Sequence, residues 1–182
     1  MVCRALSLQA TFIAAALLLC AACGSRQSTN DQRPIQSERQ QACDTFLSEA
    51  GALNTSEASE EQLTQAMERA DADAEICTRL YLESAETEAM RALAVHRGRE
   101  FTLVALNMEA ALSYHFDDRN HYCEIIRETF RLMLQNVADL ELALTTPGLA
   151  ETEEGRQLAE LRDLDLEAMD VLYEATDSFC SL

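Results

Sequence analysis

The feature that most constrains the fold is a helical repeat of apolar residues that runs from Ala42 onward. Glycine and proline are scarce in this region, and they combine into a strong break only in the stretch from Thr145 to Thr152, TTPGLAET. Alanine, leucine, glutamate and arginine, which are good helix formers, fill most of the remainder. No run of alternating β-branched residues predicts a strand. The sequence therefore predicts an all-α fold.

Turn and capping signals divide this region into five helices, and apolar residues at i, i+3, i+4 and i+7 mark a core-facing side on the last three. Long helices joined by short turns pack antiparallel. We therefore expect an antiparallel up-down bundle of four long helices plus a short N-terminal helix. The expected helices cover about Cys43–Leu53, Ser59–Glu83, Thr87–His115, the stretch from an Asp117 or Asp118 cap to Leu144, and Thr152–Phe179.

Four cysteines in the bundle region predict two disulfides, because an even number of cysteines suits an exported domain. Cys123 lies near the start of the fourth expected helix and Cys180 at the end of the fifth, and these ends coincide in an antiparallel pair. Cys43 begins the first helix and Cys77 lies toward the end of the second, again at one level. We therefore predict the pairs Cys43–Cys77 and Cys123–Cys180.

The first 22 residues have the pattern of an export signal. Arg4 supplies positive charge, and the stretch from Ala5 to Ala22 is almost uninterrupted apolar sequence that ends in two small residues. The alternative is a retained membrane anchor, since about 18 apolar residues can span a bilayer.

The segment Leu19-Cys20-Ala21-Ala22-Cys23 resembles the lipobox of bacterial lipoproteins, although the aliphatic Leu19 stands one position further from Cys23 than is usual. The resemblance implies that residues 1–22 are a signal peptide and that Cys23 is lipidated, with acyl chains such as palmitate. Because Gly24 and not an aspartate follows, it also implies an outer-membrane protein, anchored by lipid and facing the periplasm.

The stretch from Gly24 to Gln41, GSRQSTNDQRPIQSERQQ, contains one aliphatic residue. Such a composition buries too little apolar surface to offset the entropy of ordering. The predicted organisation is therefore a signal peptide over residues 1–22, a flexible tether over 23–41 and a helical domain over 42–182.

The chain is strongly acidic, with a formal net charge of −18 that becomes −19 when Arg4 is removed with the signal peptide. All 14 basic residues are arginine. This balance argues against nucleic acid as a partner, because nucleic-acid binders neutralise phosphates with a basic face. A solvated, repulsive surface is the simpler interpretation of so many acids, and a basic partner or a cation is the alternative.

Three polar residues, Arg97, Asn136 and Asp165, interrupt the apolar stripes at a similar depth in the bundle. We expect a buried layer in which Arg97 forks onto Asp165 and Asn136 completes the hydrogen bonds. A device that fixes helix register is the simpler interpretation. A site for a small polar ligand is the alternative, and the neighbouring mid-helix Gly98 adds some weight to it.

A second polar cluster, HFDDRNHYCE, contains His115, His121 and Glu124, which are the only candidates for a metal site. Because no HExxH or paired ExxH motif is present, we expect no metal or other cofactor. His96 reads as an isolated surface or packing residue. No GxSxG motif is present, so we expect no enzymatic activity.

The leading functional hypothesis is a lipoprotein whose helical domain binds an envelope protein, as a pilotin-like assembly accessory or an adaptor. Extra apolar positions that suit such binding are Leu166 and Tyr173 on the last helix, and Leu103 and Leu106 on the third. The alternative is a periplasmic sensor that binds a small ligand or a metal.

Overall fold

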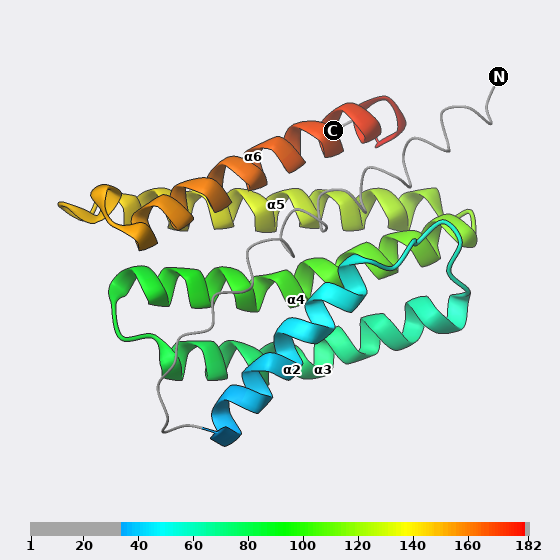
Figure 1. The fold of residues 1–182 in the computed structure, drawn as a ribbon. Helices are drawn as coiled ribbons and strands as arrows, with labels where there is room; N and C mark the ends of the chain where they lie inside the picture. The colour runs from blue at the N-terminus through cyan, green and yellow to red at the C-terminus, as the bar shows by residue number, and fades with distance from the viewer. Residues whose placement is uncertain (1–33, 181–182) are drawn as a thin grey trace.

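The computed structural model of this protein describes residues 34–180. This part of the chain forms five α-helices and one short 3-10 helix and contains no strand (Figure 1). The predicted all-α fold is confirmed. The expected signal peptide, the lipidation site Cys23 and residues 23–33 of the expected tether lie outside the described residues. The elements are α2 (Pro34–Gly51), α3 (Glu60–Ser84), α4 (Glu88–His115), α5 (Arg119–Leu144), η1 (Leu149–Glu151) and α6 (Glu153–Cys180).

Helix α2 extends further toward the N-terminus than expected. It begins at Pro34 and not at Cys43, so residues 34–41, which we assigned to the tether, are helical. Proline is favourable in the first turn of a helix, where its missing N–H would have no partner in any case. Gln, Glu and Arg, which dominate the following residues, are good helix formers and extend a helix that is packed further along the chain.

Side-chain caps begin the helices where the sequence places them. The Ser59 hydroxyl accepts from the backbone N–H of Gln62 at 3.3 Å, and the Gln62 side chain accepts from the Ser59 N–H at 2.9 Å, which together form a capping box. Thr87 caps α4 and Asp118 caps α5 in the same way. In the turn after α5, Gly148 has a φ of 79°, a left-handed conformation that favours glycine.

Helix α4 lies in the middle of the bundle (Figure 1). The pairs α3–α4, α4–α5 and α5–α6 pack side by side in up-down order, α2 packs across α3 and α4, and α6 also touches α4. The predicted antiparallel bundle is therefore confirmed, and its central helix has neighbours on several sides.

Buried apolar side chains form two main clusters, one on each side of α4. On the first side, Phe46 of α2 stacks on Phe101 of α4 with ring centroids 5.7 Å apart. On the second side, Ile126 of α5 and Leu172 of α6 pack with residues of α4. A smaller cluster around Leu158 fills the end of the bundle next to η1. The two main clusters bury the apolar stripes that the sequence predicts.

Each half of the bundle contains one disulfide. Cys43 of α2 bonds to Cys77 of α3, and Cys123 of α5 bonds to Cys180 of α6. Their Cα atoms lie 5.9 and 5.3 Å apart, within the usual range for disulfides. Both predicted pairings are confirmed.

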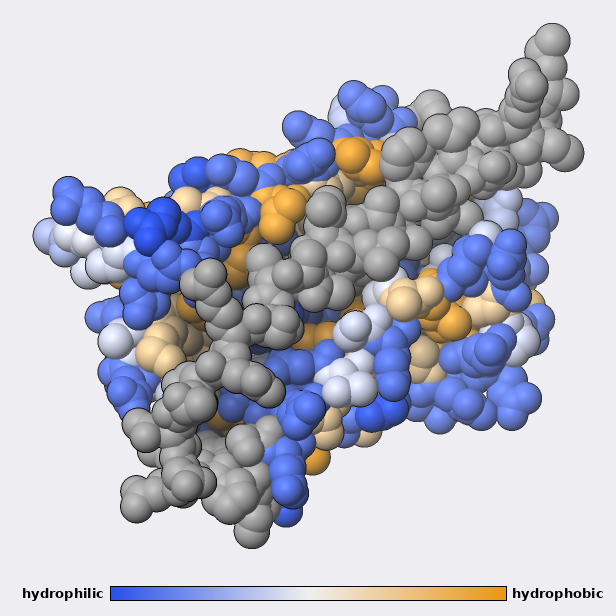
Figure 2. Space-filling view, in the orientation of Figure 1, coloured by the Kyte–Doolittle hydropathy of each residue, from blue (hydrophilic) through white to orange (hydrophobic). Residues whose placement is uncertain are grey.

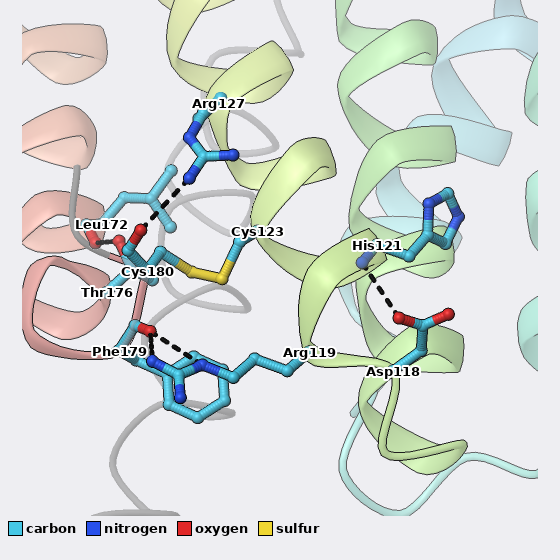
Figure 3. The surroundings of a disulfide bond; sticks show 9 residues. All are labelled: Asp118, Arg119, His121, Cys123, Arg127, Leu172, Thr176, Phe179 and Cys180. Atoms are coloured by element: carbon cyan, nitrogen blue, oxygen red, sulfur yellow. Dashed lines mark hydrogen bonds between the residues drawn. A yellow bond between two sulfur atoms is a disulfide. The ribbon is translucent and has the colours of Figure 1, made fainter.

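Two arginines of α5 hold the last turn of α6 beside the second disulfide (Figure 3). Arg127 Nη2 donates to the carbonyl of Cys180 at 3.2 Å. Arg119 Nε donates to the carbonyl of Phe179 at 3.1 Å, and the Arg119 guanidinium lies over the Phe179 ring. These bonds satisfy carbonyl groups that a helix end leaves unpaired.

Candidate functional site

The main polar feature inside the bundle is a segment of α4, His96-Arg97-Gly98-Arg99-Glu100, which we call the polar segment. Successive residues of a helix point about 100° apart, so neighbouring residues of the segment face different directions, while His96 and Glu100, four residues apart, share one side. Because α4 is surrounded by other helices, each direction meets a different neighbour.

His96 points toward α6. Its Nε2 lies 3.1 Å from Oδ2 of Asp165, and its Nδ1 lies 3.7 Å from Oε1 of Glu100. All three side chains are buried: His96 is 2% exposed, Asp165 4% and Glu100 3%. One imidazole therefore lies between two carboxylates in the interior, and its two nitrogen atoms face one carboxylate each.

Arg97 lies on the side of α4 that is near Asp44 of α2 and Tyr81 of α3. Its Nη1 donates to Oε2 of Glu100 at 2.9 Å. Burial on its own lowers the pKa of the Arg97 guanidinium, but the carboxylates of Glu100 and Asp44, together with Tyr81, outweigh burial and raise it. The Tyr81 hydroxyl donates to Oδ1 of Asp44 on α2 at 2.8 Å. Burial, followed by this bond, raises the pKa of the Tyr81 phenol.

Arg99 points toward α5. Its Nη2 lies 2.6 Å from Oδ2 of Asp139, and its Nη1 donates to Oδ1 of Asn136 at 3.1 Å. Gly98 faces α3, where a Cβ atom would lie 2.1 Å from Oγ1 of Thr78. The mid-helix glycine is therefore explained by the close approach of α3 and α4. The polar segment connects α4 to every other long helix and to the Tyr81–Asp44 pair.

The predicted layer of Arg97, Asn136 and Asp165 is therefore wrong in its contacts. Asp165 binds His96, Asn136 binds Arg99, and Arg97 binds Glu100 on the same helix and not Asp165. Counting residues along antiparallel helices gives the depth of each side chain correctly. It does not give the direction around the helix, and adjacent residues such as His96 and Arg97 differ by about 100°.

His96 is not isolated, because its side chain binds Asp165, and of the two expected alternatives, surface or packing, its burial supports packing. A usable signal is spacing, since His96 is seven residues from both Ala89 and Leu103 and therefore lies on the same side of α4 as these apolar residues. The closed environment of the His96–Asp165 pair leaves little room for a ligand, and the pair is best suited to fixing how α4 and α6 align.

The three metal candidates do not converge. His121 Nε2 lies 2.9 Å from Oε1 of Glu109 on α4, and its Nδ1 lies 3.9 Å from Oε2 of Glu124. His115 is exposed at the end of α4. Within residues 34–180, no group of three or more His, Cys, Asp or Glu side chains is arranged to hold a metal ion.

A shallow groove of about 650 Å³ lies between α3 and α4. Its walls include Thr78 and Gly98 at the close approach of the two helices, together with Arg79 and Arg99. Arg99 already binds Asn136 and Asp139, and the other charged residues of the walls are Glu75, Arg79 and Glu83.

The outer surface of α5 and α6 carries a set of exposed apolar side chains. Leu166 and Tyr173 of α6 are 41% and 47% exposed, and Leu134 of α5 is 55% exposed. The Tyr173 ring packs edge-on against Phe130 of α5, with centroids 6.4 Å apart. We call these four residues the outer apolar strip. Figure 2 shows apolar surface along α6 and between α6 and α5.

The two other apolar positions expected to be available, Leu103 and Leu106, instead pack against the core between α4, α5 and α6.

Within the part of the chain that the structure describes, no helix is long and apolar enough to cross a membrane. Comparisons with protein-family models, with curated proteins and with solved structures found no match to this chain.

Proposed function

We propose that this protein is an outer-membrane lipoprotein, anchored through Cys23 and facing the periplasm, whose helical domain binds another envelope protein as an assembly accessory or adaptor. The observation that supports binding is the outer apolar strip. Leu166 and Tyr173 are seven residues apart and lie on one face of α6, and Phe130 and Leu134 lie next to them on α5. Of these four residues only Phe130 also packs against the bundle core.

The alternative, a periplasmic sensor for a small ligand or a metal, has less support. Among residues 34–180 no metal cluster is present, and the polar segment of α4 is occupied by its own ion pairs and hydrogen bonds. We propose a binding role that involves neither catalysis nor a cofactor.

The binding role is tested by replacing Leu166 with glutamate in the full-length, lipidated protein. We expect Leu166→Glu to abolish capture of the envelope partner in intact cells. Because Leu166 is largely exposed, the melting temperature should stay nearly unchanged. Ile76→Glu on α3, where the side chain is 48% exposed, is the matched control and should leave capture intact. Equal capture by the two variants would remove the outer apolar strip from the proposal.

The anchor is tested separately by replacing Cys23 with serine. If Cys23 carries the acyl chains, Cys23→Ser should remove the lipid, so any membrane attachment that remains must come from the uncleaved apolar residues 5–22. Mass spectrometry of the wild-type N-terminus should show the lipid on Cys23. A wild-type N-terminus without lipid on Cys23, or one that still carries residues 1–22, would contradict the anchor and leave the binding face untouched.

A further inference from the structure

The exposed side of α6 carries a regular alternation of acidic and apolar side chains. It consists of Asp163, Leu166, Asp170, Tyr173 and Asp177, which follow one another at spacings of three and four residues. Residues at this spacing line up along one side of a helix. We call them the α6 stripe. It covers about 21 Å of the helix, which is roughly four turns.

The α6 stripe differs from the buried side of the same helix in its surroundings. Asp163 and Asp170 are exposed, and the ion pair of Asp163 is with its own neighbour Arg162. The nearby charge of Asp177, followed by a hydrogen bond from the phenol, raises the pKa of Tyr173. The Tyr173 hydroxyl therefore remains protonated at neutral pH and is partnered only within α6.

The charged side chains in the last 18 residues of α6 are all negative. From Asp163 to Cys180, α6 contains six acidic residues and no basic residue. On the neighbouring helix, Phe130 packs against Tyr173 and Leu134 follows one turn later, which widens the apolar part of the surface. The surface is thus an apolar strip with carboxylates at regular intervals along it.

We propose that the α6 stripe and the adjoining outer apolar strip bind an amphipathic helix of the partner, with apolar residues at spacings of three and four and lysine or arginine residues beside them. This inference rests on the proposed function and adds the chemistry of the partner. A helix fits because its side chains repeat with the same period as the stripe. Basic residues fit because they meet Asp163, Asp170 and Asp177 and steer association with an acidic protein.

Two other occupants are disfavoured by the same charges. If a second copy of the chain lay on the stripe, aspartates would face aspartates whether the two helices ran parallel or antiparallel, because Asp170 is at the centre of a symmetric pattern. An anionic lipid surface would be repelled by the three aspartates of the stripe. Both remain outcomes that the experiment can detect.

The test uses the full-length, lipidated protein with a photoreactive phenylalanine analogue at position 166, crosslinked in intact cells. The stripe variant is Asp163→Asn/Asp170→Asn/Asp177→Asn, which keeps side-chain size and removes the charge. The control variant is Glu68→Gln/Asp71→Asn/Glu75→Gln, on the exposed side of α3. The two variants have the same net charge, so they differ only in where charge is lost.

We expect the stripe variant to lower the crosslinking yield about tenfold, as the loss of several rim ion pairs would, while the control variant has little effect. The partner peptide recovered by mass spectrometry should contain apolar residues at spacings of three and four, flanked by Lys or Arg. Equal yields from the two variants, or a peptide without basic residues, would overturn this inference while leaving the binding role in place. Crosslinks to lipid or to a second copy would also overturn it. No crosslink from position 166 at all would contradict the proposed function itself.

Discussion

Helix α6 carries acidic residues on two sides, and the two sides differ in what their carboxylates contact. Asp165 faces inward, is 4% exposed, and lies 3.1 Å from Nε2 of His96. Asp163 and Asp170 face outward, and within residues 34–180 neither forms an ion pair with another helix. A buried carboxylate is costly without a partner, so the fold supplies one. The outward carboxylates carry no such cost, and the fold does not explain their regular spacing.

The largest effect that tests this comparison is expected at His96. His96→Leu leaves the carboxylates of Asp165 and Glu100 buried without the imidazole, which should lower the free energy of unfolding by about 3–5 kcal/mol. The double variant His96→Leu/Asp165→Leu should recover part of this loss, because both ends of the pair are then apolar. Urea unfolding of His96→Leu, of Asp165→Leu and of the double variant measures the coupling free energy between the two side chains. Strictly additive losses would show that the two side chains do not stabilise each other.

The second comparison is between the two disulfides, one on each side of α4. Removing either by a double Cys→Ser substitution should cost about 2–4 kcal/mol of unfolding free energy. The sequence separation is 57 residues for Cys123–Cys180 and 34 for Cys43–Cys77. The Cys123–Cys180 bond therefore closes the longer loop. In the chain-entropy account the Cys123–Cys180 bond should contribute about 0.5 kcal/mol more. Unfolding free energies of the two variants measure this difference, and the reverse order would contradict it.

A smaller effect is expected at Tyr81, the link between α3 and α2. Tyr81→Phe removes the hydrogen bond to Asp44 and should cost about 1 kcal/mol of stability at neutral pH. Burial raises the pKa of Tyr81 in the folded state, so the wild type should keep its stability below about pH 10 and lose it as the pH rises further. Unfolding curves across this pH range should show a shallower alkaline loss for Tyr81→Phe. An identical alkaline loss in both proteins would show that folding does not raise the pKa of Tyr81.

The smallest effect on stability is expected on the outward side of α6. Asp170→Asn removes an exposed charge that has no ion pair with another helix, so the unfolding free energy should change by less than about 0.5 kcal/mol. Asp165→Asn, five residues earlier, changes the same chemical group on the buried side and should destabilise the protein clearly more. Thermal unfolding of these two variants compares the two sides of α6 directly. Similar losses from both would remove the distinction between them.

Much of the fold could be predicted from the sequence because it depends on periodic patterns and on helix ends. The apolar stripes gave the helices, and the positions of Cys123 and Cys180 at facing helix ends gave their pairing. The start of α2 was missed because residues 34–41 are polar, and a polar stretch attached to a packed helix can continue it.

The contacts of the polar layer could not be predicted in the same way. Depth along a helix follows from residue number, since each residue adds about 1.5 Å. The direction of Arg97 relative to Asp165 depends on where α2, α3 and α6 lie around α4, and this is set by packing of the whole bundle. The outward position of Leu166 and Tyr173 was predictable, because both fall outside the core-facing stripe of α6.

The most direct test of the proposed role is position-specific photocrosslinking of the full-length, lipidated protein in the cells that produce it. A photoreactive residue at position 166 on α6 is compared with one at position 76 on α3, where the native side chains have similar exposure. If the outer side of α6 binds an envelope protein, position 166 should crosslink to one such protein and position 76 should not. Equal crosslinking from both positions, or none from position 166, would contradict the account.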